Sequence, residues 1–267
     1  MRLKGKIAPI SGAGRNNGRT IAHTFAREGA DLVLIAKQRE EQLRQVAKDC
    51  EALGAKTLPI LADVTKPQDV DRTVKQGLEK FGRVDVLMSV AGLRRNKLPW
   101  DFTFEEWQHM FAINVHATFL LSKALTPGMI QRRSGSIVAL GGNSSLTCSS
   151  PYTGALASSK HALHGLIKGL AQALGPYGVR ANMLSLANIE NEILDPESYR
   201  VTGPDGKEIH TGTGGDPNTT DEQRAMRSPL RRMGRQQEVA NAALFLASDE
   251  SSYITGDRII CAGGIYM

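Results

Sequence analysis

The sequence predicts an α/β fold in which a single-domain, doubly wound parallel sheet carries helices on both faces. Short apolar runs alternate with amphipathic segments along the chain, and the first run opens into a glycine-rich turn. The 267 residues, of which 41% are hydrophobic, are enough for one sizeable core. Strands separated by helices favour parallel pairing, because parallel neighbours need the crossover connections that helices supply.

Each element has a local signal. Apolar runs that end in glycine-rich or polar turns predict the strands, and apolar residues at helical spacing predict the helices. Pro67 lies in the first turn of one helix, and Gly29 and Gly54 end two others, as is typical of those positions. In chain order, the predicted strands span 6–10, 31–36, 56–64, 84–92, 135–142, 179–187 and 257–264, and the helices of the first half span 18–30, 39–55 and 67–83.

One segment, 191–227, interrupts this alternation. It is rich in Gly, Pro, Asp and Thr, and a loop of this length inside a compact domain is usually a lid or a binding loop. We therefore expect a substrate lid within one domain that spans 1–267, with an unstructured surface insertion as the alternative.

Charge and cysteine content narrow the function class. The net charge of +6 comes from scattered lysines and arginines, so neither a nucleic-acid nor a membrane partner is expected. The three cysteines have neither metal-site nor disulfide spacing, and no metal is expected. The first residues lack the apolar run of a signal peptide, which favours a cytoplasmic protein with a small-molecule substrate.

The turn "SGAGRNNG" (11–18) is the first candidate site. A glycine-rich turn between a strand and a helix lets backbone N–H groups approach a diphosphate, and the helix N-terminus adds a favourable dipole. The alternative is a helix start that needs glycine only for tight packing. The candidate cofactor-binding residues here are Ser11, Gly12, Arg15, Asn16, Asn17 and Gly18.

Short motifs follow one another along the whole chain. They are "LKGKIAPISGAG" (3–14), "LADVT" (61–65), "DVLMSVAG" (85–92), "FAINVHATF" (111–119), "GSIVAL" (135–140), "ASSKHAL" (157–163), "LGPYGVRAN" (174–182) and the chain from 228 to 264. Through the order and spacing of these motifs, more than through any single one, the chain resembles the short-chain dehydrogenase/reductase family, whose fold is Rossmann-type.

The resemblance implies a nicotinamide dinucleotide cofactor. By the resemblance, Asp63, followed by Val64, would accept a hydrogen bond from the adenine amino group, and Ala91 and Gly92 would pass under the cofactor. The strand over 31–36 runs into Lys37 where an acidic residue would favour a free 2′-hydroxyl. Lys37 and Arg15 together favour NADP(H) over NAD(H), unless both are solvated surface charges.

Several cofactor positions depart from the family pattern. Asn16 stands at the middle glycine of the turn, and asparagine is the residue besides glycine that best tolerates a positive φ. The family's Asn-Asn-Ala-Gly is Ser89-Val90-Ala91-Gly92 here, and the Pro-Gly after the sixth strand is Leu186-Ala187.

The catalytic residues that the resemblance implies are only partly present. Lys160 and Asn114 match, and Lys160 would hold the nicotinamide ribose unless it is a solvated helix lysine. Leu156 replaces the tyrosine that would protonate the substrate oxygen, and the serine position falls at Gly142 or Asn143. A leucine has no proton to donate, so proton delivery must differ from that of the family or be absent.

Few neighbouring residues are suited to replace the missing acid. Tyr152 lies one further turn along the expected helix, about 6 Å from Leu156 along the helix axis, and more naturally lines the pocket wall. We interpret His116 and His161 as structural or surface residues, and Cys148 as a small loop residue without a base partner. The expected substrate pocket is apolar and comprises Leu93, Leu146, Tyr152, Leu156 and Leu186.

Three functions remain open on this evidence. The first is an oxidoreductase that transfers hydride between NADP and a carbonyl or alcohol, with the proton supplied by water, Lys160 or Tyr152. The second is a catalytically inactive nucleotide-binding subunit, and the third is a non-redox lyase, isomerase or cyclase on the same scaffold. A homo-oligomer, either a tetramer or a dimer, is expected through helices at 102–125 and 151–175 and through the C-terminal strand.

Overall fold

The computed structural model describes residues 1–191, 200–202, 208–210 and 220–266. Its main sheet has seven parallel strands in the order β3-β2-β1-β4-β5-β6-β9, which confirms the predicted α/β class. The strands are β1 (Ile7–Ser11), β2 (Asp31–Ala36), β3 (Thr57–Leu61), β4 (Val86–Ser89), β5 (Gly135–Leu140), β6 (Val179–Leu186) and β9 (Arg258–Cys261).

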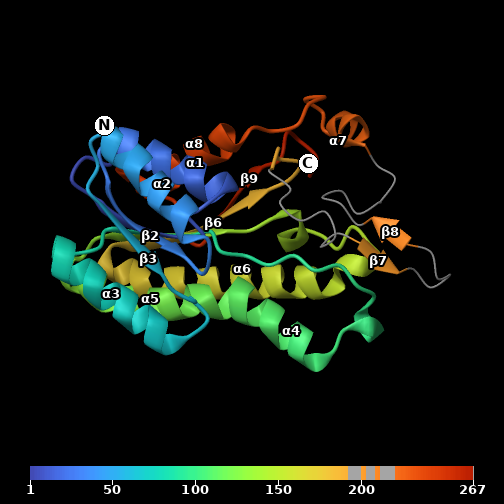
Figure 1. Cartoon of the computed structure of the whole chain (residues 1–267), viewed down its shortest axis with the longest axis horizontal. Coiled ribbons are helices and arrows are strands. Elements are labelled where there is room, and N and C mark those ends of the chain that lie inside the picture. Colours follow the sequence, from blue (N-terminus) through green and yellow to red (C-terminus); the bar gives the residue numbers. More distant parts are fainter. Residues whose placement is uncertain (192–199, 203–207, 211–219, 267) are drawn as a thin grey trace.

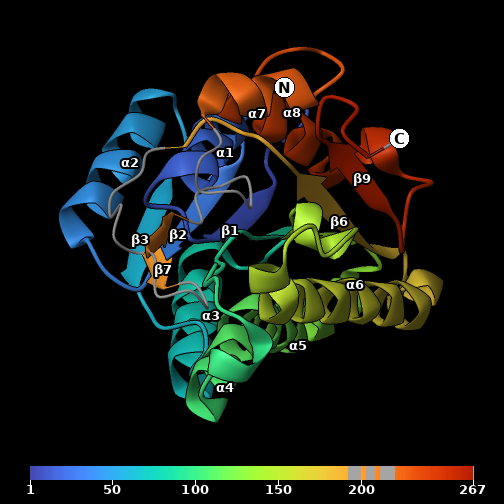
Figure 2. The ribbon, with the colours of Figure 1, turned by 90° about the vertical axis from the view of Figure 1, so that its right-hand side faces the viewer.

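Helices cover both faces of this sheet. Figures 1 and 2 show α1, α2 and α8 on one side and α3, α5 and α6 on the other. Two apolar clusters fill the two interfaces, one against each face of the sheet. The helices are α1 (Asn16–Arg27), α2 (Glu40–Ala52), α3 (Pro67–Phe81), α4 (Phe104–Phe111), α5 (Ala117–Arg132), α6 (Gly154–Leu174), α7 (Asp221–Arg227) and α8 (Gln236–Ala247).

The predicted strands all exist, but most are shorter than expected. The strand predicted over 84–92 ends at Ser89, and just beyond it the N–H groups of Val90 and Ala91 bond to the side chain of Ser11. The helix expected to include Tyr152 begins only at Gly154, so Tyr152 belongs to a separate 3₁₀ turn over Pro151–Thr153.

The predicted lid at 191–227 lies largely outside the described residues. Within it the structure describes an antiparallel pair, β7 (Arg200–Thr202) with β8 (Glu208–His210), and helix α7. Its role as a lid therefore stays a prediction.

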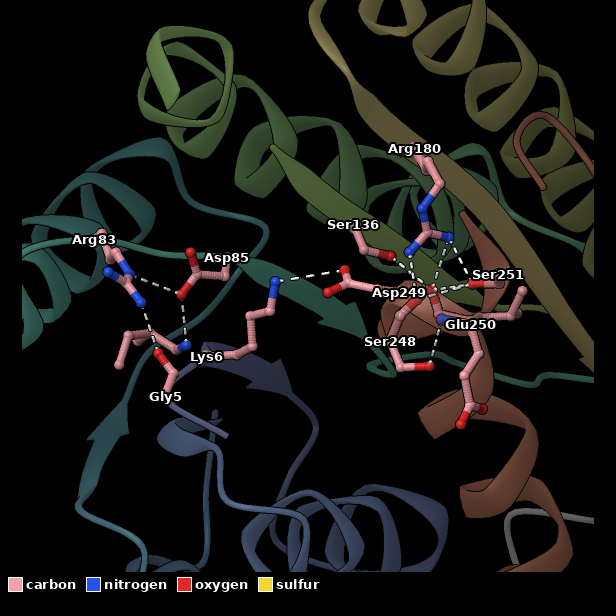
Figure 3. A network of polar contacts seen from close by, with 12 residues as sticks. Gly5, Lys6, Arg83, Asp85, Ser136, Arg180, Ser248, Asp249, Glu250 and Ser251 are labelled. Atoms are coloured by element: carbon pink, nitrogen blue, oxygen red, sulfur yellow. Dashed lines mark hydrogen bonds and ion pairs between the residues drawn. The ribbon is translucent and has the colours of Figure 1, made fainter. Parts of the chain in front are cut away.

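Polar contacts connect the amino ends of the strands (Figure 3). Asp85, just before β4, accepts a hydrogen bond from the backbone N–H of Ile7 at 2.8 Å and from Arg83 at 3.1 Å. Near the start of β6, Arg180 donates to the backbone oxygen of Ser248 at 2.9 Å and to the hydroxyl of Ser251 at 2.7 Å. These contacts stabilise the amino ends of the strands, at the opposite end of the sheet from the candidate site.

The strand order reverses between β1 and β4, where one connection runs to β2 and the other to β5. In open α/β sheets a ligand binds outside the carboxyl ends of the strands at such a reversal. The glycine-rich turn after β1 and the segment after β4 meet at this point. Among the helices that the structure describes, none has the length and apolar character needed to cross a membrane.

Candidate active site

The glycine-rich turn is tightly packed against the segment after β4. Gly12 has a φ of +71°, and a Cβ added to it would lie 3.0 Å from the backbone nitrogen of Ala91. A Cβ added to Gly18 would lie 2.0 Å from the carbonyl oxygen of Gly12. Both positions therefore require glycine, and the close packing brings the N-terminus of α1 to the carboxyl end of the sheet.

Asn16 takes the left-handed conformation that the middle position of this turn requires, with a φ of 46°. The expected tolerance of asparagine for positive φ is thus confirmed. The neighbouring Asn17 is buried, and its side-chain oxygen has no hydrogen-bond partner among the described residues. A buried acceptor without a partner carries a desolvation penalty, which a ligand that donates a hydrogen bond would remove.

Ser11, at the end of β1, fixes the segment that follows β4. Its hydroxyl oxygen accepts hydrogen bonds from the backbone N–H of Val90 at 3.1 Å and of Ala91 at 3.2 Å. These bonds fix the chain that leads to Gly92, and the structure thereby brings together the predicted residues Ser11, Gly12, Ala91 and Gly92.

The two residues expected to contact the adenosine part of a cofactor are paired with each other. The Lys37 ammonium lies 2.9 Å from the carboxylate of Asp63, and the Lys37 side chain is half exposed. Burial by itself raises the pKa of Asp63, but hydrogen bonds from Thr65 and from Lys37 outweigh it and lower the pKa to about 2. Arg15 is exposed at the start of α1. Two cations thus stand near the carboxyl ends of β1 and β2.

Lys160, Asn114 and Gly92 converge deeper in the site. A Cβ added to Gly92 would lie 3.4 Å from the Asn114 Oδ1 atom and 3.5 Å from the Lys160 Nζ atom. Lys160 is 7% exposed, and its Nζ atom donates to the carbonyl oxygen of Leu140 at 3.0 Å. Burial lowers the pKa of Lys160 to about 8. The predicted alternative of a solvated helix lysine is wrong.

A π-helical turn over Ala112–His116 presents Asn114 to the site, and such turns occur frequently at functional sites. Asn114 accepts from the backbone N–H of Leu93 at 2.8 Å and donates to the carbonyl oxygen of Leu93 at 2.9 Å. Its amide also donates to the Ser159 hydroxyl at 3.0 Å. Sequence reasoning missed Ser159, because a serine on a helix carries no signal of its partner.

Leu156 lies one helical turn before Lys160, as the sequence indicated. It is buried in an apolar cluster with Met110 and Ala155, against which Phe102 and Trp107 also pack. The leucine therefore contributes to the contact between α6 and α4.

The other candidate residues border this region without forming an acid–base pair. Tyr152 is half-buried, and its backbone oxygen accepts from the N–H of Lys97. Asn143 is half-buried and accepts from the Ser144 hydroxyl at 3.4 Å. His116 and His161 are exposed, as expected for surface residues. The remaining predicted pocket residues, Leu93, Leu146 and Leu186, are all half-buried.

The fold, together with the site at the carboxyl ends of its strands, defines a doubly wound, nucleotide-binding type of α/β protein. Residues 6–199 match the family model described as short chain dehydrogenase, and residues 203–266 match the model described as Enoyl-(Acyl carrier protein) reductase. The chain belongs to the short-chain dehydrogenase/reductase family of oxidoreductases, which bind a nucleotide cofactor.

Two relatives match this chain over nearly its whole length or all of it. The chain is 33% identical over 270 residues to the 3-oxoacyl-[acyl-carrier-protein] reductase FabG of Escherichia coli strain K12, with 100% of both chains covered. It is 33% identical to the Oxidoreductase UcpA of Escherichia coli O157:H7, covering 98% of this chain and 95% of the relative.

Solved structures agree with this fold. A short-chain dehydrogenase/reductase structure from Burkholderia xenovorans superposes with a TM-score of 0.87 at 29% identity, covering 99% of this chain and 97% of that one. A short chain dehydrogenase from Burkholderia cenocepacia J2315 in complex with NADP gives a TM-score of 0.83 at 26% identity, with 100% of both chains covered.

Proposed function

We propose that the chain is an NADP(H)-dependent oxidoreductase that acts on a carbonyl or alcohol of a small, apolar substrate and delivers the proton without the family tyrosine. The observation that carries this proposal is the convergence of Lys160, Asn114 and Gly92 beside the glycine-rich turn. The NADP complex of the Burkholderia cenocepacia structure supports the choice of cofactor.

The residues present fit a dinucleotide. The backbone of the turn over 11–18 and the N-terminus of α1 suit a diphosphate, and the unpartnered Asn17 oxygen suits a donor such as a ribose hydroxyl. Lys37 and Arg15 would bind the 2′-phosphate, and Lys160 would hold the nicotinamide ribose. The bound dinucleotide supplies or accepts the hydride.

Lys160 is the ionisable group best suited to proton delivery. Its pKa of about 8 keeps it mostly protonated at neutral pH, yet close enough to neutrality to exchange a proton with a bound water or alkoxide. The half-buried Leu93, Leu146 and Leu186 give the substrate side an apolar lining in this proposal, whereas Leu156 is buried between α6 and α4. Tyr152 stands outside helix α6 and lines the wall in this proposal.

The working state that we propose is a cytoplasmic homo-oligomer, a dimer or a tetramer. Phe119 on α5, which belongs to the surface expected to associate, has 47% of its area exposed. Light scattering and analytical ultracentrifugation of the purified chain test this part of the proposal.

A catalytically inactive nucleotide-binding subunit is the second candidate. The observation that favours it is the burial of Leu156 among Met110 and Ala155, which is a well-packed core contact where the family places a reactive hydroxyl. Nucleotide binding without turnover of any carbonyl substrate would support this candidate over the first.

The deciding experiment is a titration with NADPH and with NADH, followed by calorimetry and intrinsic fluorescence. We expect tighter binding of NADPH and a loss of that preference in Lys37→Asp, with Lys66→Asp as the exposed control. Absence of binding at millimolar concentration of either nucleotide would overturn the proposal. A screen of apolar ketones and aldehydes with NADPH then separates the enzyme from the inactive subunit.

A further inference from the structure

The side chain of Gln236 connects three segments around the glycine-rich turn. Its Nε2 atom donates to the Asn16 Oδ1 atom at 3.3 Å and to the carbonyl oxygen of Glu190 at 3.0 Å. Its Oε1 atom accepts from the Thr20 hydroxyl at 2.9 Å. One amide thus joins the turn, the first part of α1 and the chain that follows β6.

The turn has a specific need for such an anchor. Asn16 has a φ of 46°, a conformation that an asparagine adopts less readily than a glycine. The bond from Gln236 holds the side chain of Asn16, and with it the backbone of the turn at this residue. We therefore infer that the hydrogen bond from Gln236 stabilises a backbone conformation at Asn16 that a glycine would adopt without such a bond.

Hydrogen bonds around the start of α8 hold Gln236 in place. It is the first residue of α8, and two residues later Glu238 accepts a hydrogen bond from Arg232 at 2.8 Å and one from the backbone N–H of Arg235 at 2.7 Å. The backbone N–H of Glu190 bonds to the carbonyl oxygen of Gly234 at 2.9 Å. These bonds therefore fix both the loop that precedes Gln236 and the first turn of α8 that follows it.

We propose that Gln236 is a positioning residue for dinucleotide binding. It holds the turn over 11–18 in its diphosphate-binding shape and sets the backbone of Glu190 relative to that turn. This inference rests on the proposed NADP(H) function, because the ligand that it positions is the diphosphate of that cofactor.

The chain offers a matched control in the next residue. Gln237 also bridges α8 to α1, donating to the Thr24 hydroxyl at 3.0 Å and to Asn241 at 2.9 Å, but it contacts α1 two turns from Asn16. Gln236→Ala and Gln237→Ala each remove an amide between the same two helices. Only the first should affect the turn.

The experiment measures the dissociation constants of NADPH and of the redox-inactive fragment ADP-ribose 2′-phosphate by calorimetry, with thermal unfolding as the stability readout. We expect Gln236→Ala to raise the dissociation constants of both ligands by about fivefold or more. Gln237→Ala should lower the unfolding temperature about as much as Gln236→Ala does, but its dissociation constants for both ligands should equal those of the wild type.

A double-mutant cycle tests the connection through Asn16. In an Asn16→Gly background the turn reaches positive φ without the amide, so Gln236→Ala should weaken binding by less than about twofold. Wild-type affinity in Gln236→Ala, or equal weakening in Gln237→Ala, would overturn the inference while leaving the proposed function intact. Absence of binding by the wild-type chain would overturn both.

Discussion

The Lys37 ammonium lies 2.9 Å from the Asp63 carboxylate and joins the ends of β2 and β3. The sequence assigned these residues to opposite ends of the adenosine group, with Lys37 on the 2′-phosphate and Asp63 on the adenine. In the proposed NADP(H) complex the 2′-phosphate and the Asp63 carboxylate would therefore share or compete for the three N–H donors of Lys37.

The ion pair makes stability depend on acidity in a defined range. The folded pKa of Asp63, about 2, lies below its ordinary value of 3.8, so the stabilisation is complete above about pH 4 and is lost as the pH falls toward 2. Asp63→Asn should lower the free energy of unfolding at pH 7 by about 1 kcal/mol, and the difference from wild type should vanish near pH 2. Urea unfolding measures it, and Asp71→Asn, at an exposed position on α3, serves as the control.

Lys160 should make stability depend on pH in a second, alkaline range. Its folded pKa of about 8 lies below its ordinary value of 10.5, so the unfolded chain binds more protons between these values and stability rises with pH across that window. Lys160→Met should abolish the rise, which is of the order of 2 kcal/mol. Unfolding at pH 7.5 and pH 10 measures it. A rise that persists in Lys160→Met would contradict the burial of this amine, and the exposed Lys168 serves as the control position.

Two glycines of the same turn should respond very differently to alanine. At Gly18 the added Cβ would lie 2.0 Å from a backbone oxygen, whereas at Gly14 its nearest neighbour is the Ala36 Cβ at 3.9 Å. Gly18→Ala should destabilise the fold by about 2 kcal/mol or more and weaken NADPH binding at least about tenfold. Gly14→Ala should leave both nearly unchanged. Thermal unfolding and calorimetry compare them, and equal effects would show that the turn is not packed as described.

Leu156 is the position at which to restore a proton donor. Leu156→Tyr should raise the rate of NADPH-dependent carbonyl reduction, because a phenol would stand one helical turn from the Lys160 ammonium. Overpacking against Met110 should cost about 1 to 3 kcal/mol of stability. Leu156→Phe adds the same bulk without the hydroxyl, so it should lose stability equally but gain no activity. Steady-state kinetics of the two variants decide whether the hydroxyl itself matters.

The sequence predicted the strands because their signal is local. Apolar runs such as "DLVLIA" are buried on both faces of a parallel sheet, and β2 spans exactly the residues of that run. Element ends were less accurate where a side chain replaced a backbone partner. The N–H group of Ala91 bonds to the Ser11 hydroxyl, and that of Val90 bonds to both the hydroxyl and the backbone oxygen of Ser11; no periodicity in the sequence indicates this.

The site was predicted in part. Motif spacing identified Lys160, Asn114 and Gly92, and the structure brings these three together. The polar partners that hold the site were not foreseen, since Gln236 and Asn16 are 220 positions apart and neither residue type reveals its partner. Lys37 and Asp63 were both identified, but as separate ligand contacts and not as a pair.

The contacts of Arg180 and Asp85 at the amino ends of the strands have an evolutionary consequence. They lie at the amino ends of the strands, away from the carboxyl ends near which Lys160, Asn114 and Gly92 meet. A leucine packed between α6 and α4 is therefore compatible with the same anchors of the sheet. A lineage with this architecture can exchange residues at the site while these amino-end contacts stay unchanged.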